Sequence, residues 1–244
     1  MRIEVCDDHE QMSRRAAARI ARLLRGKPRL LFGGVTGDTP TRTYARLAEM
    51  KAGEPALFRR VRILKMDEWM GLPAGHPATS ERYFRVNVLR PLGIERARYE
   101  GFRPRPARLE AECARIGAFL EREGPMDVCV LGLGTNGHLL FNEPASSLPP
   151  GPHVARLSAA SRRHAMVRAM KSPPRHGLTL GLADILAART ILLLVSGRHK
   201  IVPFRRMLED GVTTRCPASL LRLHPSVTVY CDRDAADGLT SGRR

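Results

Sequence analysis

The stretch from residue 128 to residue 144 reads VCVLGLGTNGHLLFNEP, and it decides the fold that we expect for this chain. An apolar run ends in a series of three glycines, after which His138 and Glu143 follow. This pattern is typical of a buried strand whose carboxyl end opens into a loop that carries acid and base groups. In open α/β sheets, ligands bind at that edge. The alternative is a strand followed by a glycine turn, with the histidine and the glutamate on the surface.

Outward from this stretch, strands and helices alternate along the chain. Apolar positions at helical spacing and short apolar runs indicate the individual elements. We expect helices over residues 8–25, 41–50, 80–89, 109–122, 158–170 and 200–209, and strands over 30–32, 61–66, 127–133, 190–195 and 227–230. Residues 171–176 are expected to form a loop or lid, 178–188 a short strand or turn and a helix, and 217–223 a helix. This alternation predicts a mostly parallel α/β sheet with helices on both faces.

The length and composition favour one domain. The chain has 244 residues, of which 43% are hydrophobic, and this is enough to fill a single core. With no internal repeat and no long linker, we expect a domain over residues 1–234 and a disordered tail over 235–244. No apolar stretch approaches the roughly 20 residues that span a bilayer, and no signal peptide is apparent. We therefore expect a soluble cytoplasmic protein.

The charge and the cysteines narrow the class of protein further. The formal net charge is +17, which invites a nucleic-acid hypothesis. The basic residues, however, are almost all arginine and are spread along the whole chain rather than gathered in one stripe. Such a positive field attracts anionic metabolites and gives weak polyanion binding. The five cysteines are scattered and form no CxxC pair, so neither a disulfide framework nor a zinc site is indicated.

Residues 33–39 form a Gly/Thr-rich loop between a predicted strand and a predicted helix. Such a loop can aim backbone N–H groups at a phosphate. It matches neither a Walker sequence nor G-x-G-x-x-G, so nucleotide binding is not implied. Asp38 is an awkward neighbour for a phosphate, and the alternative is that it points away and caps the helix.

Several groups with acid, base or cationic chemistry follow predicted strands. Asp67 and Glu68 end one strand, and because side chains alternate there, only one of them can face a given pocket. If Asp67 faces inward, burial would raise its pKa and suit it to act as a base. His138 is a candidate proton carrier, which Glu143 could orient. Lys200 follows another strand and could bind a phosphate as a compact charge. The alternatives are a solvated acidic turn and a surface lysine.

Four short motifs carry a family resemblance. They are Thr36-Gly37-Asp38-Thr39-Pro40, Met66-Asp67-Glu68-Trp69, Gly137-His138-Leu139-Leu140-Phe141-Asn142-Glu143-Pro144 and Gly197-Arg198-His199-Lys200. Together they resemble the glucosamine-6-phosphate deaminase/isomerase family, which is sister to the 6-phosphogluconolactonases. The similarity covers nearly the whole chain, from Leu30 to Asp232. It implies a Rossmann-like open sheet and an enzyme that converts a phosphorylated amino sugar to a ketose-6-phosphate and ammonia, without a metal or organic cofactor.

The resemblance also implies roles for individual residues. Asp67 is similar to the general base that moves a proton between C2 and C1 of the opened sugar. His138 resembles the acid/base group that opens the pyranose ring, and Glu143 the carboxylate that works with it. Lys200 matches a phosphate-binding lysine, and the phosphate loop corresponds to residues 36–39, which are Thr36, Gly37, Asp38 and Thr39.

This chain departs from the family pattern at three places. Asn136 stands where some members have an aspartate that supports the histidine, so no negative charge stands there. Asp38 replaces a small residue of the phosphate loop. The predicted helix over 158–170 does not place an arginine at the usual phosphate-binding position, and Arg168 is the nearest candidate.

Two questions stay open at the level of the sequence. The first is the epimer, where a finer resemblance in residues 69, 131–136, 177–182 and 217–221 favours galactosamine-6-phosphate over glucosamine-6-phosphate. The second is the reaction, since a 6-phosphogluconolactonase and a non-catalytic sugar-phosphate sensor or polyanion-binding protein are the alternatives. The Asp67 motif and residues 141–144 favour the deaminase. We expect no membrane partner and no specific nucleic acid, and a homo-oligomer is left open.

Overall fold

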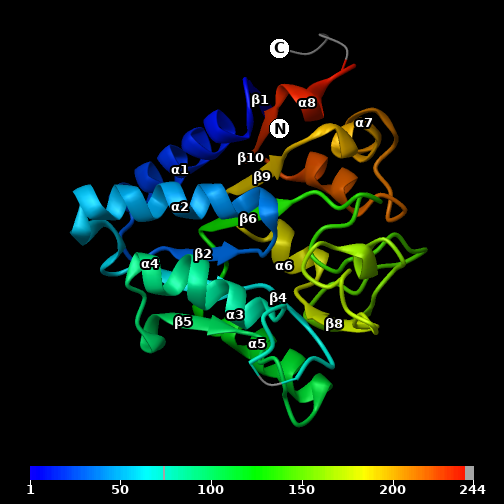
Figure 1. The fold of residues 1–244 in the computed structure, drawn as a ribbon, viewed down its shortest axis with the longest axis horizontal. Helices are drawn as coiled ribbons and strands as arrows, with labels where there is room; N and C mark the ends of the chain where they lie inside the picture. The colour runs from blue at the N-terminus through cyan, green and yellow to red at the C-terminus, as the bar shows by residue number, and fades with distance from the viewer. Residues whose placement is uncertain (74, 240–244) are drawn as a thin grey trace.

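A parallel sheet of seven strands forms the centre of the molecule. The computed structural model describes residues 1–73 and 75–239. Its strand order is β1-β10-β9-β6-β2-β3-β5, and every neighbouring pair is parallel. Figure 1 shows β10 near both chain termini and β5 toward the opposite edge. The predicted open, mostly parallel α/β sheet in a single domain is confirmed.

The elements have the following bounds. The strands of the large sheet are β1 (Arg2–Cys6), β2 (Leu31–Gly34), β3 (Arg62–Lys65), β5 (Tyr99–Gly101), β6 (Val128–Gly132), β9 (Ile191–Val195) and β10 (Val227–Asp232). The α-helices are α1 (His9–Gly26), α2 (Asp38–Gly53), α3 (Ser80–Phe84), α4 (Arg90–Leu92), α5 (Leu109–Glu123), α6 (Leu182–Leu186), α7 (Ile201–Glu209) and α8 (Arg233–Ala236). None of the described helices is both long and apolar enough to cross a membrane.

Helices cover both faces of the sheet because the strand side chains alternate between two cores. Phe32, Val130 and Leu192 pack on the face that α1, α2 and α3 cover. Their chain neighbours, such as Leu131 and Leu193, pack on the opposite face with α5, α6 and α7. The sequences of strands that are buried on both faces are continuous apolar runs. This accounts for the unbroken hydrophobic sequence of β6 and β9.

A second, three-stranded antiparallel sheet lies at the end of β3. It consists of β4 (Asp67–Trp69), β8 (His176–Thr179) and β7 (His153–Arg156), in the order β4-β8-β7. β4 begins two residues after β3 ends, so the chain turns directly from the large sheet into the small one. Within the small sheet, Asp67 pairs with Thr179. The small sheet therefore fixes the position of the Met-Asp-Glu motif.

The predicted helix over residues 158–170 is wrong. The segment contains only a 3₁₀ turn, Ser161–Arg163, followed by further turns. Most of its backbone bonds span three residues rather than four, as in His164 N–H to Ser161 C=O and Val167 N–H to His164 C=O. Val167 is fully buried, so the segment packs as an irregular loop.

Three other boundaries also differ from the sequence prediction. α2 begins at Asp38 rather than at residue 41, and the helix over 80–89 continues from α3 into a π-helical turn, Arg85–Leu89. The expected tail begins too early, because α8 extends to Ala236 and Ala235 is fully buried. Residues 240–244 of that expected tail lie outside the described residues.

Candidate active site

A cavity of about 490 Å³ lies at the carboxyl ends of the central strands, where α/β sheets bind ligands. Its walls come from the loop after β2, from β4, from the loop after β6, from the irregular segment 158–170 and from the turn before α7. Eight predicted site residues line it, and these are Thr36, Gly37, Asp38, Thr39, Asp67, His138, Arg168 and Lys200. Asn136 and Glu143 do not line the cavity but hydrogen-bond with the groups that do.

Asp67 and Glu68 point in opposite directions, as strand alternation predicts. Asp67 lines the cavity although it is only 5% exposed, and its carboxylate accepts a 3.4 Å hydrogen bond from the Ser80 hydroxyl. Glu68 is fully buried on the other side. It pairs with the Lys65 ammonium at 2.5 Å and accepts the N–H groups of Ser80 and Glu81 at the start of α3. Glu68 therefore holds α3 in place, and only Asp67 can reach a ligand.

The environment of Asp67 suits a base that works near neutral pH. Burial raises the pKa of Asp67 to about 7, and the negative charge of Glu68 acts in the same direction. Lys65 and the Ser80 hydroxyl act in the opposite direction on this pKa. An aspartate with this pKa is ionised in part at pH 7 and still binds a proton strongly.

His138, which also lines the cavity, belongs to a hydrogen-bonded group. The side-chain oxygen of Asn136 lies 2.7 Å from His138 Nδ1, and the Asn136 amide donates to Glu143 Oε2 at 2.9 Å. Glu143 also accepts the Ser158 N–H at 3.1 Å and the Ser161 hydroxyl. Burial acts to raise the pKa of Glu143, but His138, Ser161 and Asn136 outweigh it and lower the pKa to about 2. The group therefore contains an ionised carboxylate.

These contacts also determine which nitrogen of neutral His138 carries the proton. A carboxylate only accepts hydrogen bonds, so the Asn136 NH₂ must face Glu143 and its oxygen must face the histidine. Nδ1 then carries the hydrogen, and Nε2 is left with a free lone pair. Nε2 is thus the atom that can exchange a proton with a ligand.

The glycines of the loop after β6 allow the histidine to sit there. A Cβ on Gly134 would lie 2.4 Å from the atoms of the His138 ring, closer than any real contact. Gly137 has a positive φ of 89°, which L side chains rarely adopt. The Gly-rich sequence is therefore needed to place His138 at this edge of the sheet.

The part of the cavity wall formed by the start of α2 is suited to an anion. The amino terminus of α2 begins there, with Gly37 as its N-cap at φ 118° and without a side-chain cap. Unpaired N–H groups and the helix dipole favour a phosphate at such a position. Asp38 lies in the first turn of α2 and does not cap the helix, so that alternative is wrong.

Two cationic side chains also line this cavity. Lys200 donates to the Leu133 carbonyl at 2.6 Å, and burial lowers its pKa to about 8. Arg168 lines the cavity from the irregular segment. The cavity thus contains a buried carboxylate, a histidine, two cationic side chains and the amino terminus of α2.

Sequence reasoning missed two contributors to the site, His164 and Ser161. His164 lines the cavity, with its ring centroid 5.7 Å from that of Trp69. Burial lowers the pKa of His164 to about 4, so this ring is neutral at pH 7. Trp69 also packs against Phe141, with 4.6 Å between centroids, and Ser161 holds Glu143. His164 and Ser161 lie on a segment without regular periodicity, so no sequence pattern indicates where they point.

Comparison with known proteins assigns the family. The family model for glucosamine-6-phosphate isomerases/6-phosphogluconolactonase matches residues 7–230, and this chain belongs to that family. AgaI of Escherichia coli (strain K12), which is named as a candidate deaminase, is 37% identical over 91% of this chain and 88% of its own. The glucosamine-6-phosphate deaminase of Geobacillus sp. (strain WCH70) is 37% identical over 96% of this chain and 94% of its own.

Solved structures agree with this assignment. A monomeric glucosamine-6-phosphate deaminase is 34% identical and superposes with a TM-score of 0.92, covering 97% of this chain and 99% of that one. The 6-phosphogluconolactonase of Trypanosoma brucei is 22% identical, with a TM-score of 0.76 over 98% of both chains. The likeness to the lactonase shows a shared fold alone.

Proposed function

We propose that this protein is an amino-sugar-6-phosphate deaminase/isomerase, which converts a hexosamine-6-phosphate to a ketose-6-phosphate and ammonia. The observation that carries the proposal is the buried Asp67 carboxylate, whose pKa is near 7, in one cavity with His138 and an anion-binding helix terminus. Deaminases over 30% identical to this chain along nearly its whole length support the same reaction. We assign the individual steps as follows.

Ring opening is the proposed task of His138. The sugar enters as a closed pyranose, and opening it requires removal of the proton from O1 and delivery of a proton to the ring oxygen. The free Nε2 of His138 can carry that proton between the two oxygens. Asn136 and Glu143 then act as positioning residues, because they hold the ring and its Nδ1 hydrogen in place.

Isomerisation is the proposed task of Asp67. Its carboxylate takes the proton from C2 of the open-chain aldose ammonium, while the carbonyl oxygen at C1 takes a proton from the ammonium group and an enol amine forms. Asp67 then returns the proton to C1, which leaves a protonated imine at C2. Water adds to that protonated imine and ammonia departs as the ammonium ion, so the atoms and charges balance without a redox step.

The phosphate of the substrate binds beside the amino terminus of α2 in this proposal. Lys200, Arg168 and the N–H groups at the start of α2, from Thr36 to Thr39, would hold it. These interactions are about equal in the ground state and the transition state, and they therefore act mainly on KM. Asp38 opposes them, because its carboxylate lies in the same first turn.

For the epimer, we favour galactosamine-6-phosphate, which would give tagatose-6-phosphate. The preference rests on the finer sequence resemblance around Trp69 and in residues 131–136, 177–182 and 217–221. AgaI and the Geobacillus enzyme are equally identical to this chain, so overall identity does not separate the epimers. A site that hydrogen-bonds one hydroxyl can discriminate strongly, because the wrong epimer leaves buried polar groups unpaired.

The test is ammonia release from galactosamine-6-phosphate and glucosamine-6-phosphate, measured side by side, with 6-phosphogluconolactone hydrolysis as the competing assay. We expect ammonia from at least one hexosamine phosphate, a higher kcat/KM for the galactosamine epimer and no lactone hydrolysis. Lactone hydrolysis without ammonia would establish the lactonase alternative. If the enzyme is more efficient on glucosamine-6-phosphate, only the epimer preference is wrong.

The same assay tests the base with a matched pair of variants. Asp67→Asn keeps the size of the side chain but cannot take a proton, so we expect kcat to fall about 10²–10⁴-fold with substrate binding retained. Asp234→Asn removes an exposed carboxylate and should have no effect. Exchange of the C2 proton with solvent at the wild-type rate in Asp67→Asn would contradict the assignment.

A further inference from the structure

A second cavity, of about 630 Å³, lies at the β5 edge of the sheet and is lined by none of the residues assigned above. Its walls come from α3, the π-helical turn Arg85–Leu89, α4, β5 and the loop that follows β5. Ile94, Tyr99 and Phe102 supply apolar surface and are each at least nine-tenths buried. The cavity has the size and the mixed lining that small-molecule sites share.

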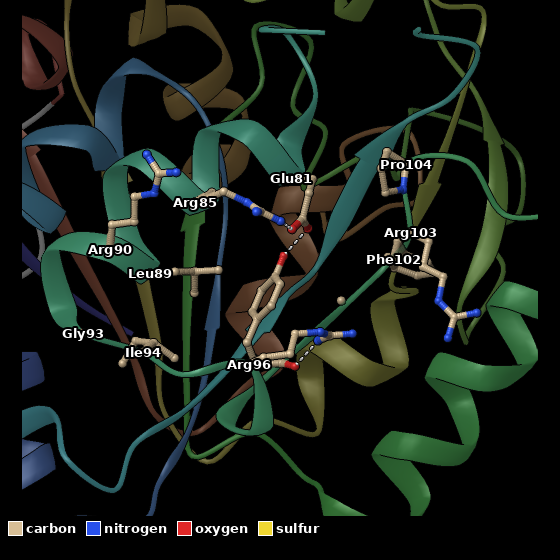
Figure 2. A pocket seen from close by; sticks show the side chains of 12 residues that line it. Glu81, Arg85, Leu89, Arg90, Gly93, Ile94, Arg96, Phe102, Arg103 and Pro104 are labelled. Carbon is tan, nitrogen blue, oxygen red and sulfur yellow. Dashed lines mark hydrogen bonds and ion pairs between the residues drawn. The ribbon is translucent and has the colours of Figure 1, made fainter. Parts of the chain in front are cut away.

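Four arginines line this cavity, against one glutamate. Figure 2 shows Arg85 and Arg90 on the helical segment, Arg96 on the turn before β5 and Arg103 beyond it. Arg90 and Arg96 pair with no carboxylate among residues 1–73 and 75–239. Arg96 instead donates to the Tyr99 carbonyl at 2.8 Å, with its guanidinium 5.7 Å from the centre of the Tyr99 ring.

In a chain with a net charge of +17, most exposed arginines are solvated and need no ligand to explain them. Here, however, arginines from separate segments surround one concave apolar surface. A π-helical turn supplies Arg85 and Leu89, and such turns are frequent at functional sites. Guanidinium groups bind phosphate and carboxylate through paired hydrogen bonds.

Glu81 connects this cavity to the candidate active site. Its carboxylate accepts a hydrogen bond from the Tyr99 hydroxyl at 2.6 Å and one from Arg85 at 3.3 Å, and it lies 3.6 Å from the Lys65 ammonium. Lys65 is fully buried and also pairs with Glu68, the neighbour of Asp67. The contacts thus form a continuous chain from Arg85 to the residue next to the proposed base.

We propose that this cavity, referred to below as the arginine cavity, is an effector site for a small polyanion that carries phosphate or carboxylate groups. Arg90, Arg96 and Arg103 would bind the anionic groups, while Ile94, Tyr99 and Phe102 would contact the body of the ligand. A ligand that also recruits Arg85 weakens its pairing with Glu81. The Lys65 ammonium is then drawn toward Glu81 and away from Glu68, which leaves more negative charge beside Asp67.

The effect on catalysis follows from that shift of charge and rests on the proposed function of Asp67. The charged groups that act on Asp67 are Glu68, which raises its pKa, and Lys65, which lowers it, with the Ser80 hydroxyl as a hydrogen-bond donor. A weaker Lys65–Glu68 pair therefore leaves less ionised Asp67 at pH 7. The ligand is expected to lower kcat.

Binding is tested by calorimetric titration, independently of activity, with pyrophosphate and with citrate as probes of phosphate and carboxylate recognition. The background is Lys200→Ala/Arg168→Ala, which removes the proposed catalytic phosphate contacts. We expect one site in this background, and a loss of affinity of at least tenfold when Arg90→Glu/Arg96→Glu is added. Arg29→Glu/Arg60→Glu changes the net charge equally at exposed positions outside the cavity, and it should leave binding unchanged.

The coupling is tested on the chain with an intact catalytic site. Pyrophosphate should lower kcat at least twofold at saturating substrate, where competition for the substrate phosphate site disappears, and Arg85→Gln should bind the probe but lose this effect. Absence of binding by both probes, or binding that the Arg90→Glu/Arg96→Glu change leaves intact, would overturn the site. Binding of pyrophosphate without a change in kcat would overturn the coupling alone. If the wild-type protein binds the probe but releases no ammonia from either hexosamine phosphate, only the proposed function is wrong.

Discussion

At the scale of single residues, the molecule places two neighbouring carboxylates in opposite roles. Glu68 is fully buried, but its carboxylate forms an ion pair with the Lys65 ammonium and accepts hydrogen bonds from two N–H groups at the start of α3. Asp67 is nearly as buried, but among residues 1–73 and 75–239 its only hydrogen-bond donor is the Ser80 hydroxyl. The difference in pairing, rather than in burial, keeps Asp67 available as a base.

The pKa values of two groups predict the pH dependence of the reaction. Asp67 must be ionised to act as a base, so kcat/KM should fall as the pH decreases through about 7. Lys200 must be protonated to bind a phosphate, so kcat/KM should fall again as the pH rises through about 8. In a pH series at constant ionic strength, Lys200→Arg should move only the alkaline limb, to higher pH, because arginine stays charged. An unchanged alkaline limb would assign it to another group.

Asp38 is expected to weaken the binding of substrate. Its carboxylate lies in the first turn of α2, where the substrate phosphate would sit. Asp38→Ser removes that negative charge and keeps a small polar side chain, so we expect KM to fall several-fold with kcat little changed. Steady-state kinetics on both epimers is the measurement. A higher KM in the serine variant would mean that Asp38 contacts the sugar rather than opposing the phosphate.

At the scale of elements, the sequence predicts what periodicity and strand ends encode. The amphipathic helix over 8–25 is confirmed as α1, and the long buried strands β6, β9 and β10 lie where apolar runs indicated them. Because parallel strands share one carboxyl edge, residues that follow different strands come together there. Asp67, His138 and Lys200 line one cavity for this reason.

Elements without periodicity could not be predicted from the sequence. β4 and β7 have only three and four residues, and they are strands because they pair with β8. The segment 158–170 has the composition of a helix, but it forms 3₁₀ turns, and its Val167 belongs to one apolar cluster with Trp69 and Phe141. His164 and Ser161 lie on that segment, so their place in the site depends on tertiary contacts alone.

The loop after β6 should not tolerate a side chain at Gly134. A Cβ on Gly134 would lie 2.4 Å from the His138 ring. Gly134→Ala should displace the ring and lower kcat by about 10²-fold, since misplacement by 1 Å can cost that much. Gly211→Ala is the control and should retain activity, because Gly211 is exposed, lies outside the cavity and has no atom of the described residues within 4 Å of the added Cβ. The loss should shrink with an open-chain substrate, and an equal loss would contradict a ring-opening role for His138.

At the scale of the whole molecule, the positive charge and the site act together. The chain carries a formal charge of +17, and the active-site cavity and the arginine cavity both contain cationic side chains. A positive field raises the local concentration of an anionic substrate, and salt screens it. Such a field needs no single stripe of basic residues, because charges spread over the whole chain contribute to it.

The buried base should also reduce the stability of the folded protein. In the unfolded chain Asp67 loses its proton near pH 3.8, while in the folded protein it keeps the proton until about pH 7. Between these values the unfolded state binds fewer protons, so the free energy of unfolding falls as pH rises, by up to about 4 kcal/mol. Asparagine does not ionise, and Asp67→Asn should therefore be more stable than the wild type at pH 8.

Urea unfolding of the wild type and of Asp67→Asn at pH 5, 6, 7 and 8 measures this effect. We expect the stability advantage of the variant to grow with pH and to level off above pH 7, where Asp67 is ionised in both states. Asp234→Asn, at an exposed position, should show a constant difference from the wild type. An advantage of Asp67→Asn that is independent of pH would mean that the carboxylate is ionised in the folded protein throughout this range. Asp67 would then be too weak a base at neutral pH to serve as the proton carrier that the reaction requires.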